Sequence, residues 1–372
     1  MPDAAPDSGN LHDGPWLTIR VDREALRHNI GEFRRLVEPP TRLMAVVKAN
    51  AYGHGLERVG VALADADAFG VATLSDAHRL RSAGLSQRIV LLSGFDEPGD
   101  LQELRALQVE TVVHHQCQID LLERSEGTPI RVWLKIDSGM HRLGIDPANA
   151  SSAYHRLKQA ASVADELVLM THLASADEAE PEQTPEQLTT FQQAIEHLSG
   201  PRSIANSPGV LNFPDTRADW VRVGGLLYGL STRPDKSGAD YGLRPVMTLQ
   251  SKLIAINQVA AGQRIGYGGS YRCARDQRIG IVAIGYGDGY PRHARSGTPV
   301  MVGNALCHTV GRVSMDLLAI DLAPAPHAKI GDPVTLWGPN LPAETVAECA
   351  ETIAYELTCG VTRRVLFVER EG

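Results

Sequence analysis

Short apolar runs recur through the first two thirds of the chain and alternate with polar segments whose spacing favours helices. The first such segment, residues 22–36, places Leu26, Ile30 and Phe33 on one helical face. The apolar runs are residues 44–48, 69–73, 89–92, 111–113, 132–136, 167–171, 203–205 and 220–223. About eight strands alternating with helices predict a (β/α)8 barrel of the TIM type. A doubly wound sheet is the alternative, but no G-x-G-x-x-G motif opens the first strand–helix turn.

Beyond about residue 243, strand-like runs follow one another with turn signals and little helix. These runs are residues 246–256, 278–284, 299–302, 306–310, 317–320 and 333–337. Gly303-Asn304 between two of them predicts a tight hairpin, and residues 345–355 predict one helix. We therefore expect a flexible tail at 1–14, an α/β barrel at 15–242 and a mostly β domain at 243–372.

Composition narrows the class of protein. The 372 residues are 43% hydrophobic and 22% charged, and the net charge of −8 argues against a nucleic-acid partner. No stretch approaches the ~20 apolar residues of a membrane span, and the N-terminus is acidic where a signal peptide is basic and then apolar. The five cysteines are scattered and lack a metal-type C-x-x-C pair. We expect a cytoplasmic protein with reduced thiols, no bound metal and no membrane partner.

A barrel carries its functional groups at the C-terminal ends of the strands and on the loops that follow. Lys48 ends the first apolar run, and Tyr52 follows in a glycine-containing turn. Such a lysine can lose its charge and condense with an aldehyde cofactor, although the position alone is more typical of a solvated lysine. The other polar residues that follow expected strands are Lys135, Asp137, Arg142, Thr171, His172, Asn206, Ser207, Arg222, Gly224 and Gly225.

The last two expected strands lead into turns, Asn206-Ser207-Pro208-Gly209 and Gly224-Gly225. Each turn alone indicates only a tight loop. Together they resemble a backbone nest with a hydroxyl donor, which suits a phosphate. A strand-end lysine, a phosphate cradle and cations between them indicate pyridoxal phosphate in a barrel.

At this point the chain resembles a known family. Nine ordered motifs between about residues 16 and 369 resemble those of the alanine racemases, whose fold is a cofactor-binding barrel followed by a β domain. The first is Val47-Lys48-Ala49-Asn50-Ala51-Tyr52-Gly53-His54-Gly55, which is similar to the family's cofactor-lysine signature. The others are residues 135–144, 171–172, 205–207, 221–224, 266–268, 285–289, 311–316 and 355–356.

The resemblance implies a role for each matching residue in a pyridoxal-phosphate-dependent homodimer whose active site is shared between subunits. Lys48 would hold the cofactor aldehyde and act as one catalytic base. Tyr267, from the partner subunit, would be the second base, on the opposite face of the cofactor. The remaining implied residues are Tyr52, Ser207, Gly224, Gly225 and Tyr355 on the phosphate, Arg222 on the pyridine nitrogen, Arg142 and Met315 on the substrate carboxylate, and Tyr286 at the substrate entry.

The chemistry explains why a racemase needs these residue types. A tyrosine with a pKa of ~10 needs about 4 kcal/mol to deprotonate at pH 7, so nearby cations must lower that cost. His172, Arg142 and Arg222 are the candidates, and His172 is better interpreted as a residue that tunes the tyrosine than as a metal ligand. An arginine against the ring nitrogen can only donate, so the nitrogen stays unprotonated and reprotonation at the α-carbon is favoured over transamination.

Lys135 and three departures from the family pattern leave questions open. The family's equivalent lysine can be carbamylated to hold Arg142, whereas pairing of Lys135 with Asp137 is the alternative. Ser314 stands where the family usually has cysteine, and Val223 where it usually has proline. The ending 363–366 only loosely follows the usual arginine-proline-arginine. We expect these departures to affect rate and stability more than reaction class.

The predicted function is interconversion of L-alanine and D-alanine, to supply D-alanine for peptidoglycan or to catabolise it. A racemase of broader specificity, or one that prefers serine or lysine, is the first alternative. A non-catalytic pyridoxal-phosphate carrier would lack the β domain that carries Tyr267, Tyr286 and Met315. A barrel decarboxylase would be expected to have an acidic residue in place of Arg222.

Overall fold

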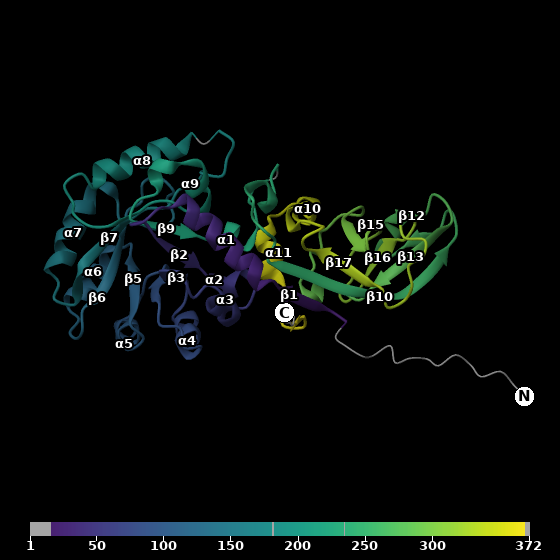
Figure 1. Ribbon diagram of the computed structural model, residues 1–372, viewed down its shortest axis with the longest axis horizontal. Coiled ribbons are helices and arrows are strands. Elements are labelled where there is room, and N and C mark those ends of the chain that lie inside the picture. Colours follow the sequence, from purple (N-terminus) through teal and green to yellow (C-terminus); the bar gives the residue numbers. More distant parts are fainter. Residues whose placement is uncertain (1–15, 181, 234, 369–372) are drawn as a thin grey trace, which may run out of the picture. The chain divides into compact units, whose positions relative to one another are not determined.

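The computed structural model describes residues 16–180, 182–233 and 235–368, which belong to two compact units (Figure 1). Of the described residues, those between 23 and 244 form one unit, and 16–22 together with those between 245 and 368 form the other. The tail expected at 1–14 lies outside the described residues. The sequence assigned residues 15–242 to the barrel, whereas β1 (Thr18–Val21) pairs with β10 (Met247–Val259) in the sheet of the second unit.

The first unit is a closed barrel of eight parallel strands, as the apolar runs predicted. The strands are β2 (Arg42–Val46), β3 (Ala68–Val71), β4 (Arg88–Leu91), β5 (Val109–Val113), β6 (Ile130–Lys135), β7 (Val163–Met170), β8 (Arg202–Ser203) and β9 (Trp220–Val223). The α-helices are α1 (Arg23–Leu36), α2 (Lys48–Tyr52), α3 (Leu56–Ala62), α4 (Leu74–Ser82), α5 (Pro98–Ala106), α6 (Gln116–Glu123), α7 (Ala150–Gln159), α8 (Gln183–Ala194) and α9 (Ser207–Asn212). Across the described ranges, no helix is both long and apolar enough to cross a bilayer.

The barrel interior is filled by side chains from β2 to β7 and β9. They are Met44, Ala68, Val90, Val112, Trp133, Val168, Met170 and Trp220. Because helices cover the outside of a parallel barrel, its strands are apolar on both faces, which explains why they are continuous apolar runs in the sequence. The expected barrel fold is confirmed.

The second unit is an eight-stranded sheet with the order β13-β16-β15-β14-β17-β10-β1-β18. Apart from β1 and β10, its strands are β13 (Gln277–Val282), β14 (Pro299–Val302), β15 (Ala305–Thr309), β16 (Leu318–Asp321), β17 (Pro333–Trp337) and β18 (Leu366–Val368), and a separate hairpin holds β11 (Arg264–Ile265) and β12 (Tyr271–Arg272). The hairpin predicted at Gly303-Asn304 joins β14 and β15, where Val302 pairs with Ala305. The mostly β character predicted for this part of the chain is confirmed.

The single helix expected at 345–355 is two helices, α10 (Ala343–Cys349) and α11 (Ala354–Gly360). Glu351 adopts a left-handed φ of 52°. Its N–H donates to the carbonyl of Glu348 at 3.2 Å, and the next N–H, of Thr352, donates to that of Ala347 at 3.0 Å. This Schellman motif satisfies the last carbonyls of α10 and ends the helix, although no glycine marks the site in the sequence.

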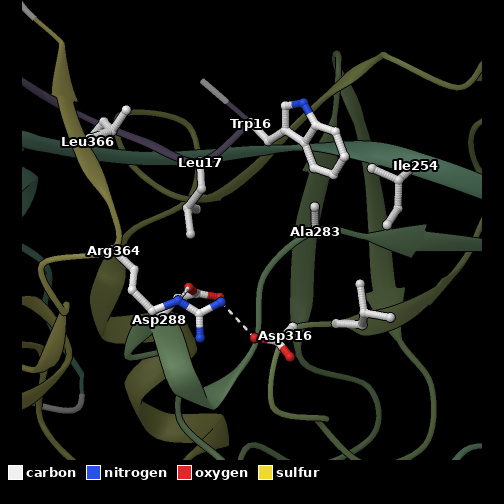
Figure 2. Close-up of a pocket in the computed structure, with 9 residues that line it drawn as sticks. Trp16, Leu17, Ile254, Ala283, Asp288, Asp316, Arg364 and Leu366 are labelled. Carbon is white, nitrogen blue, oxygen red and sulfur yellow. Dashed lines mark hydrogen bonds and ion pairs between the residues drawn. The ribbon is translucent and has the colours of Figure 1, made fainter. Parts of the chain in front are cut away.

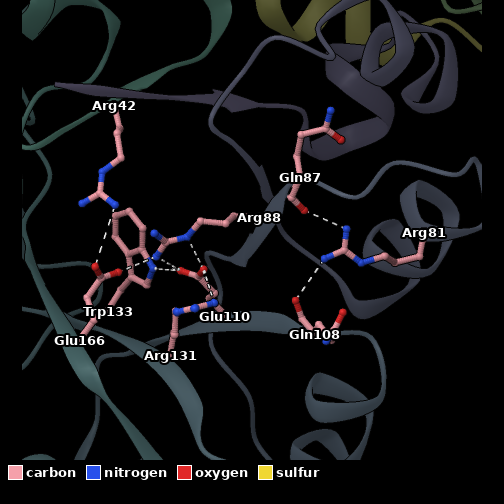
Figure 3. Close-up of polar contacts among 9 residues, drawn as sticks. All are labelled: Arg42, Arg81, Gln87, Arg88, Gln108, Glu110, Arg131, Trp133 and Glu166. Atoms are coloured by element: carbon pink, nitrogen blue, oxygen red, sulfur yellow. Dashed lines mark hydrogen bonds and ion pairs between the residues drawn. The ribbon is translucent and has the colours of Figure 1, made fainter. Parts of the chain in front are cut away.

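A buried polar network lies near the N-terminal ends of β4 to β7 (Figure 3). Arg88 donates to both oxygens of Glu110 at 2.5 and 2.9 Å and to Glu166 Oε1 at 2.8 Å. Trp133 Nε1 donates to Glu110 Oε2 at 2.8 Å. Since Glu110 is buried, its charge depends on these donors.

Replacing Glu110 with alanine should destabilise the barrel by about 3 to 5 kcal/mol, because Arg88 and the Trp133 indole would lose their shared buried acceptor. Glu123→Ala is the matched control, since it removes an exposed carboxylate paired with Arg156 and should cost less than about 1 kcal/mol. Urea unfolding followed by circular dichroism compares the two variants. Equal losses would contradict a special contribution from the buried pair.

Candidate functional site

Lys48 begins a left-handed turn at the end of β2. The strand ends at Val46, so Lys48 is not a strand residue as expected, but the first residue of α2. Residues 49–52, here called the left-handed turn, all have φ between 52° and 54°. Ordinary residues avoid this conformation, at a cost of roughly 1–2 kcal/mol each. Asn50 offsets part of that cost, since its Oδ1 accepts from Leu56 N at 3.1 Å and from Arg79 Nη2 at 2.8 Å.

Two hydroxyls and a backbone N–H converge beside the left-handed turn. Gly224 N donates to Ser207 Oγ at 2.7 Å, and a Cβ placed on Gly224 would lie 2.7 Å from Tyr52 Oη. Gly224 immediately follows β9, Ser207 begins α9, and Gly225 begins the 3-10 helix η3 (Gly225–Tyr228). Any side chain at residue 224 would fill this space. The three groups form a cradle of the kind that binds phosphate.

Arg222 is held rigidly inside the barrel by acceptors on β8 and on the residues that follow β7 and β8. Its side chain is buried, and burial lowers its pKa to about 10. Its partners are Ser203 O at 3.0 Å, Ser203 Oγ at 2.7 Å, Thr171 O at 2.7 Å, Ile204 O at 3.2 Å and His172 Nδ1 at 3.2 Å. Within the described part of the chain, these bonds all come from Nη1 and Nη2, so Nε can serve a ligand.

Positive charge dominates this end of the barrel. Burial lowers the pKa of Lys135 to about 8, and the charges of Arg222 and Arg142 act in the same direction. The pKa of His172 is well below its usual value, mainly through burial and then through the Arg222 charge. His172 is therefore neutral at pH 7, and its Nδ1 accepts from Arg222. Such a cluster favours an anionic ligand.

Arg142 projects from a closed loop after β6. Asp137 Oδ1 accepts from the backbone N–H groups of Gly139 and His141 at 3.1 and 3.0 Å, and Gln183 Nε2 donates to Gly139 O at 2.7 Å. Ile145 N donates to Lys135 O at 2.8 Å and closes the base of the loop. The loop is thus ordered, while the Arg142 side chain is exposed.

In the second unit, the segments that carry Tyr286 and Met315 lie against each other. Tyr286 N donates to Ser314 O at 3.1 Å and Gly287 N to Met315 O at 2.8 Å. Because backbone atoms make these contacts, the loop does not depend on the cysteine that Ser314 replaces. Both Tyr286 and Met315 have exposed side chains.

A pocket of about 350 Å³ lies next to these two segments, and Arg364 spans it (Figure 2). The Arg364 guanidinium contacts Asp316 at 2.6 Å and Asp288 at 3.1 Å. Arg364 therefore ties the segment that follows Tyr286 to the one that follows Met315. This ion-paired arginine lies in the chain ending that departs from the family pattern.

Tyr267 and Tyr355 occupy other parts of the second unit. Tyr267 begins a 3-10 turn in the hairpin between β11 and β12, and 67% of its surface is exposed. Tyr355 is the second residue of α11 and is half-buried. The roles expected for these two tyrosines, and for Tyr286 and Met315, stay predictions.

Within the barrel unit, the structure brings together most of the residues that the sequence singled out. They are Lys48, Tyr52, Lys135, Arg142, His172, Ser207, Arg222, Gly224 and Gly225. Val223 is the last residue of β9 and pairs with Ala45, so it lies in the strand expected at 220–223. Sequence reasoning assigned no role to His54, Ser203 or Tyr228, although His54 lies inside the quoted lysine motif and Tyr228 follows the Gly224-Gly225 pair closely.

Comparison with known proteins agrees with this arrangement. The sequence profile of the alanine racemase N-terminal domain matches residues 21–232, and that of the alanine racemase C-terminal domain matches residues 246–368. The biosynthetic alanine racemase of Escherichia coli K12 is 48% identical over 350 residues, which cover 94% of this chain and 97% of that protein. Two similar solved structures are the biosynthetic alanine racemase of Pseudomonas aeruginosa (43% identity, TM-score 0.92) and the alanine racemase of Acinetobacter baumannii (36% identity, TM-score 0.89). Each match covers 96% of this chain and 100% of the other.

Fold and site thus define a barrel protein with a cationic cluster at the C-terminal ends of its strands and a β-rich second unit. The matched profiles and the identity over nearly the whole chain make the assignment more specific. The chain belongs to the alanine racemase family. The resemblance that the nine motifs indicated is confirmed.

Lys135→Met should stabilise the ligand-free protein at pH 7 and lose that advantage near pH 10. With a folded pKa of about 8 against a usual 10.5, the native protein holds fewer protons than the unfolded chain between these values, so wild-type stability rises with pH across this window. The gain at pH 7 should be about 3 kcal/mol. Urea unfolding at both pH values measures it. Lys158→Met, an exposed lysine on α7, is the control, and an equal gain at pH 7 and pH 10 would contradict the prediction.

Proposed function

We propose that the protein interconverts L-alanine and D-alanine and that it uses pyridoxal phosphate held in the barrel. The observation that carries this proposal is the convergence of three features at one end of the barrel: the Lys48 turn, the Tyr52–Ser207–Gly224 cradle and the rigid Arg222. The names of the similar proteins support alanine as the substrate. The term biosynthetic in those names supports a role in supplying D-alanine.

The residues at this end of the barrel fit the cofactor. When bound, pyridoxal phosphate supplies an aldehyde that reacts with a lysine amine and a ring that stabilises negative charge at the substrate α-carbon. Lys48 Nζ would hold the aldehyde, and Arg222 Nε would donate to the pyridine nitrogen. The phosphate would be bound by Tyr52, Ser207, Gly224, Gly225 and Tyr355.

Two bases would exchange the α-proton on opposite faces of the substrate. Lys48 Nζ serves one face, and Tyr267 Oη of a second subunit serves the other. The exposure of Tyr267 on its hairpin supports its availability to a second chain. A phenol needs nearby positive charge to lose its proton at pH 7, and Arg222 and Arg142, with neutral His172 beside them, supply that environment.

The remaining predicted residues would orient the substrate. Arg142 and the backbone at Met315 would bind its carboxylate, and Tyr286 would line the entry. Lys135 would add its uncharged amine to carbon dioxide and release a proton, which gives a carbamate that pairs with Arg142. A pKa of about 8 leaves a useful fraction of the amine uncharged at neutral pH, which supports this modification.

We also propose which unit supplies each part of the site and where in the cell the enzyme acts. The barrel unit binds the cofactor, the β-rich unit contributes Tyr267, Tyr286, Met315 and Tyr355, and a homodimer completes the site. All five cysteines are free, which is typical of a reducing compartment and supports a cytoplasmic location.

The protein should racemise alanine, and Lys48→Ala should abolish both racemisation and the visible absorption of bound pyridoxal phosphate that borohydride fixes to the chain. Without the Lys48 amine no covalent link to the aldehyde can form. Chiral separation after incubation with each isomer of alanine, serine and lysine measures activity and specificity together. Lys158→Ala should retain both signals. A fixable band that survives in Lys48→Ala would refute the assignment of the lysine, and faster turnover of serine or lysine would reassign the substrate.

Tyr267→Phe should slow removal of the α-proton from L-alanine by at least about a hundredfold, because it removes a general base, while pyridoxal phosphate still binds. The measurement is exchange of the α-proton with deuterated solvent, started separately from each isomer. Tyr271→Phe, in the same hairpin, is the control. Unchanged exchange from L-alanine would show that Tyr267 is not the second base.

A further inference from the structure

His54 makes two side-chain hydrogen bonds to the left-handed turn. Its Nδ1 lies 3.0 Å from Ala51 O and 2.8 Å from Tyr52 O. Both carbonyl oxygens can only accept, so Nδ1 carries the proton and the imidazole donates to both of them. The ring is fully buried, and burial lowers the pKa of His54 to about 4, so it is neutral at physiological pH.

Tyr228 holds the other end of the same segment. Its hydroxyl donates to Val46 O, the last carbonyl of β2, at 3.1 Å. The Tyr228 ring stacks on His54 with centroids 4.6 Å apart and lies 4.9 Å from the ring of Tyr52. Tyr228 is fully buried, so the packing of these three rings is fixed. Two stacked side chains therefore hold the backbone on both sides of Lys48. Tyr228 binds the carbonyl of Val46, and His54 binds those of Ala51 and Tyr52.

Tyr228 also belongs to the segment that forms the cradle. It ends η3, which begins at Gly225 directly after Gly224, and Leu227 N donates to Gly224 O at 2.8 Å. Asn29 Nδ2 on α1 donates to Leu227 O at 2.9 Å, and this bond fixes η3 to α1 of the barrel unit. The stacked pair thus links two sites that lie far apart in sequence, the lysine turn after β2 and the phosphate cradle after β9.

We propose that His54 and Tyr228 are positioning residues that clamp the left-handed turn to the phosphate cradle, so that the Lys48 amine and the Tyr52 hydroxyl meet one cofactor molecule in fixed geometry. This inference rests on the proposed use of pyridoxal phosphate. Four consecutive left-handed residues without glycine persist only where the surroundings hold them. His54 and Tyr228 hold the left-handed turn from the cradle. Asn50 holds it from α3 and α4, through its bonds to Leu56 N and Arg79 Nη2.

Tyr228→Phe is the sharpest test, because it keeps the stacked ring and removes the hydroxyl that donates to Val46 O. We expect the dissociation constant for pyridoxal phosphate, titrated into cofactor-depleted full-length protein, to rise about tenfold. Tyr154→Phe is the matched control, since it removes a tyrosine bond to Ser199 O, at 2.8 Å, from α7 in the same unit. It should lower thermal stability by a similar amount and change the dissociation constant less than twofold.

A second measurement reports on the clamp without the cofactor. The amides of Ala51, Gly53 and Gly55 donate to the carbonyls of residues 47, 49 and 50, at 2.9, 3.0 and 2.9 Å. These bonds depend on the left-handed turn, so hydrogen exchange at the three amides should quicken in Tyr228→Phe and not in Tyr154→Phe. His54→Leu should quicken it further. His54→Gln, whose amide can donate to one of the two carbonyls, should restore part of the protection and part of the cofactor affinity.

The outcomes separate the inference from the proposed function. If wild-type protein binds no pyridoxal phosphate, the proposed function fails and the inference fails with it. If wild type binds the cofactor normally and Tyr228→Phe matches Tyr154→Phe in both affinity and exchange, only the clamp is overturned. A variant with lower thermal stability but unchanged affinity and turn exchange would assign Tyr228 to the core alone and would also overturn the clamp.

Discussion

The site depends on positive charge that the barrel holds away from water. Arg222 and Lys135 are buried, and their pKa values are lowered to about 10 and about 8 because each loses solvation. Arg142 and Lys48 add further charge close enough to lower the pKa of His172. A barrel end of this kind is a poor place for another cation and a good place for a phosphate and a carboxylate. Its charge pattern therefore favours anionic ligands.

Other groups of the barrel offset the loss of solvation of its arginine charges. The Arg222 guanidinium donates hydrogen bonds to the backbone carbonyls of Ser203, Ile204 and Thr171. These fixed dipoles solvate its charge in place of water. At the other end of the strands, the half-buried Arg88 has carboxylate partners, so its charge is neutralised within the fold. The two ends of the barrel thus treat their arginines differently. At the N-terminal ends of the strands the charge of Arg88 is paired with carboxylates, whereas at the C-terminal ends the charge of Arg222 has, among the described residues, only neutral acceptors for its side-chain hydrogen bonds and can attract a ligand. This is the arrangement expected of a barrel that binds its ligands at the C-terminal ends of the strands.

The sequence predicted the barrel strands, and it singled out most of the residues that gather near their C-terminal ends, because both depend on local patterns. Each parallel strand is an apolar run, and the barrel residues singled out for the site lie near the end of such a run or in the loop after it. The left-handed turn could not be predicted, because Ala49, Asn50 and Ala51 prefer right-handed conformations and are held otherwise by Arg79 and His54, which lie outside the turn. The pairing of β1 with β10 was missed because its partners are more than 200 residues apart in sequence. The break at Glu351 was missed since a left-handed glutamate carries no sequence signal.

Arg222 links this structure to the type of reaction proposed. Its pKa of about 10 is lower than usual, yet it leaves the guanidinium charged at neutral pH. A charged guanidinium donates hydrogen bonds and accepts none, so it cannot share the proton that a carboxylate would place on a pyridine nitrogen. Its terminal nitrogens are fixed by backbone carbonyls, so the side chain cannot turn away to admit another partner. In the proposed mechanism Arg222 would leave the pyridine nitrogen unprotonated, and return of a proton to the substrate α-carbon by Lys48 or Tyr267 would be favoured over transamination.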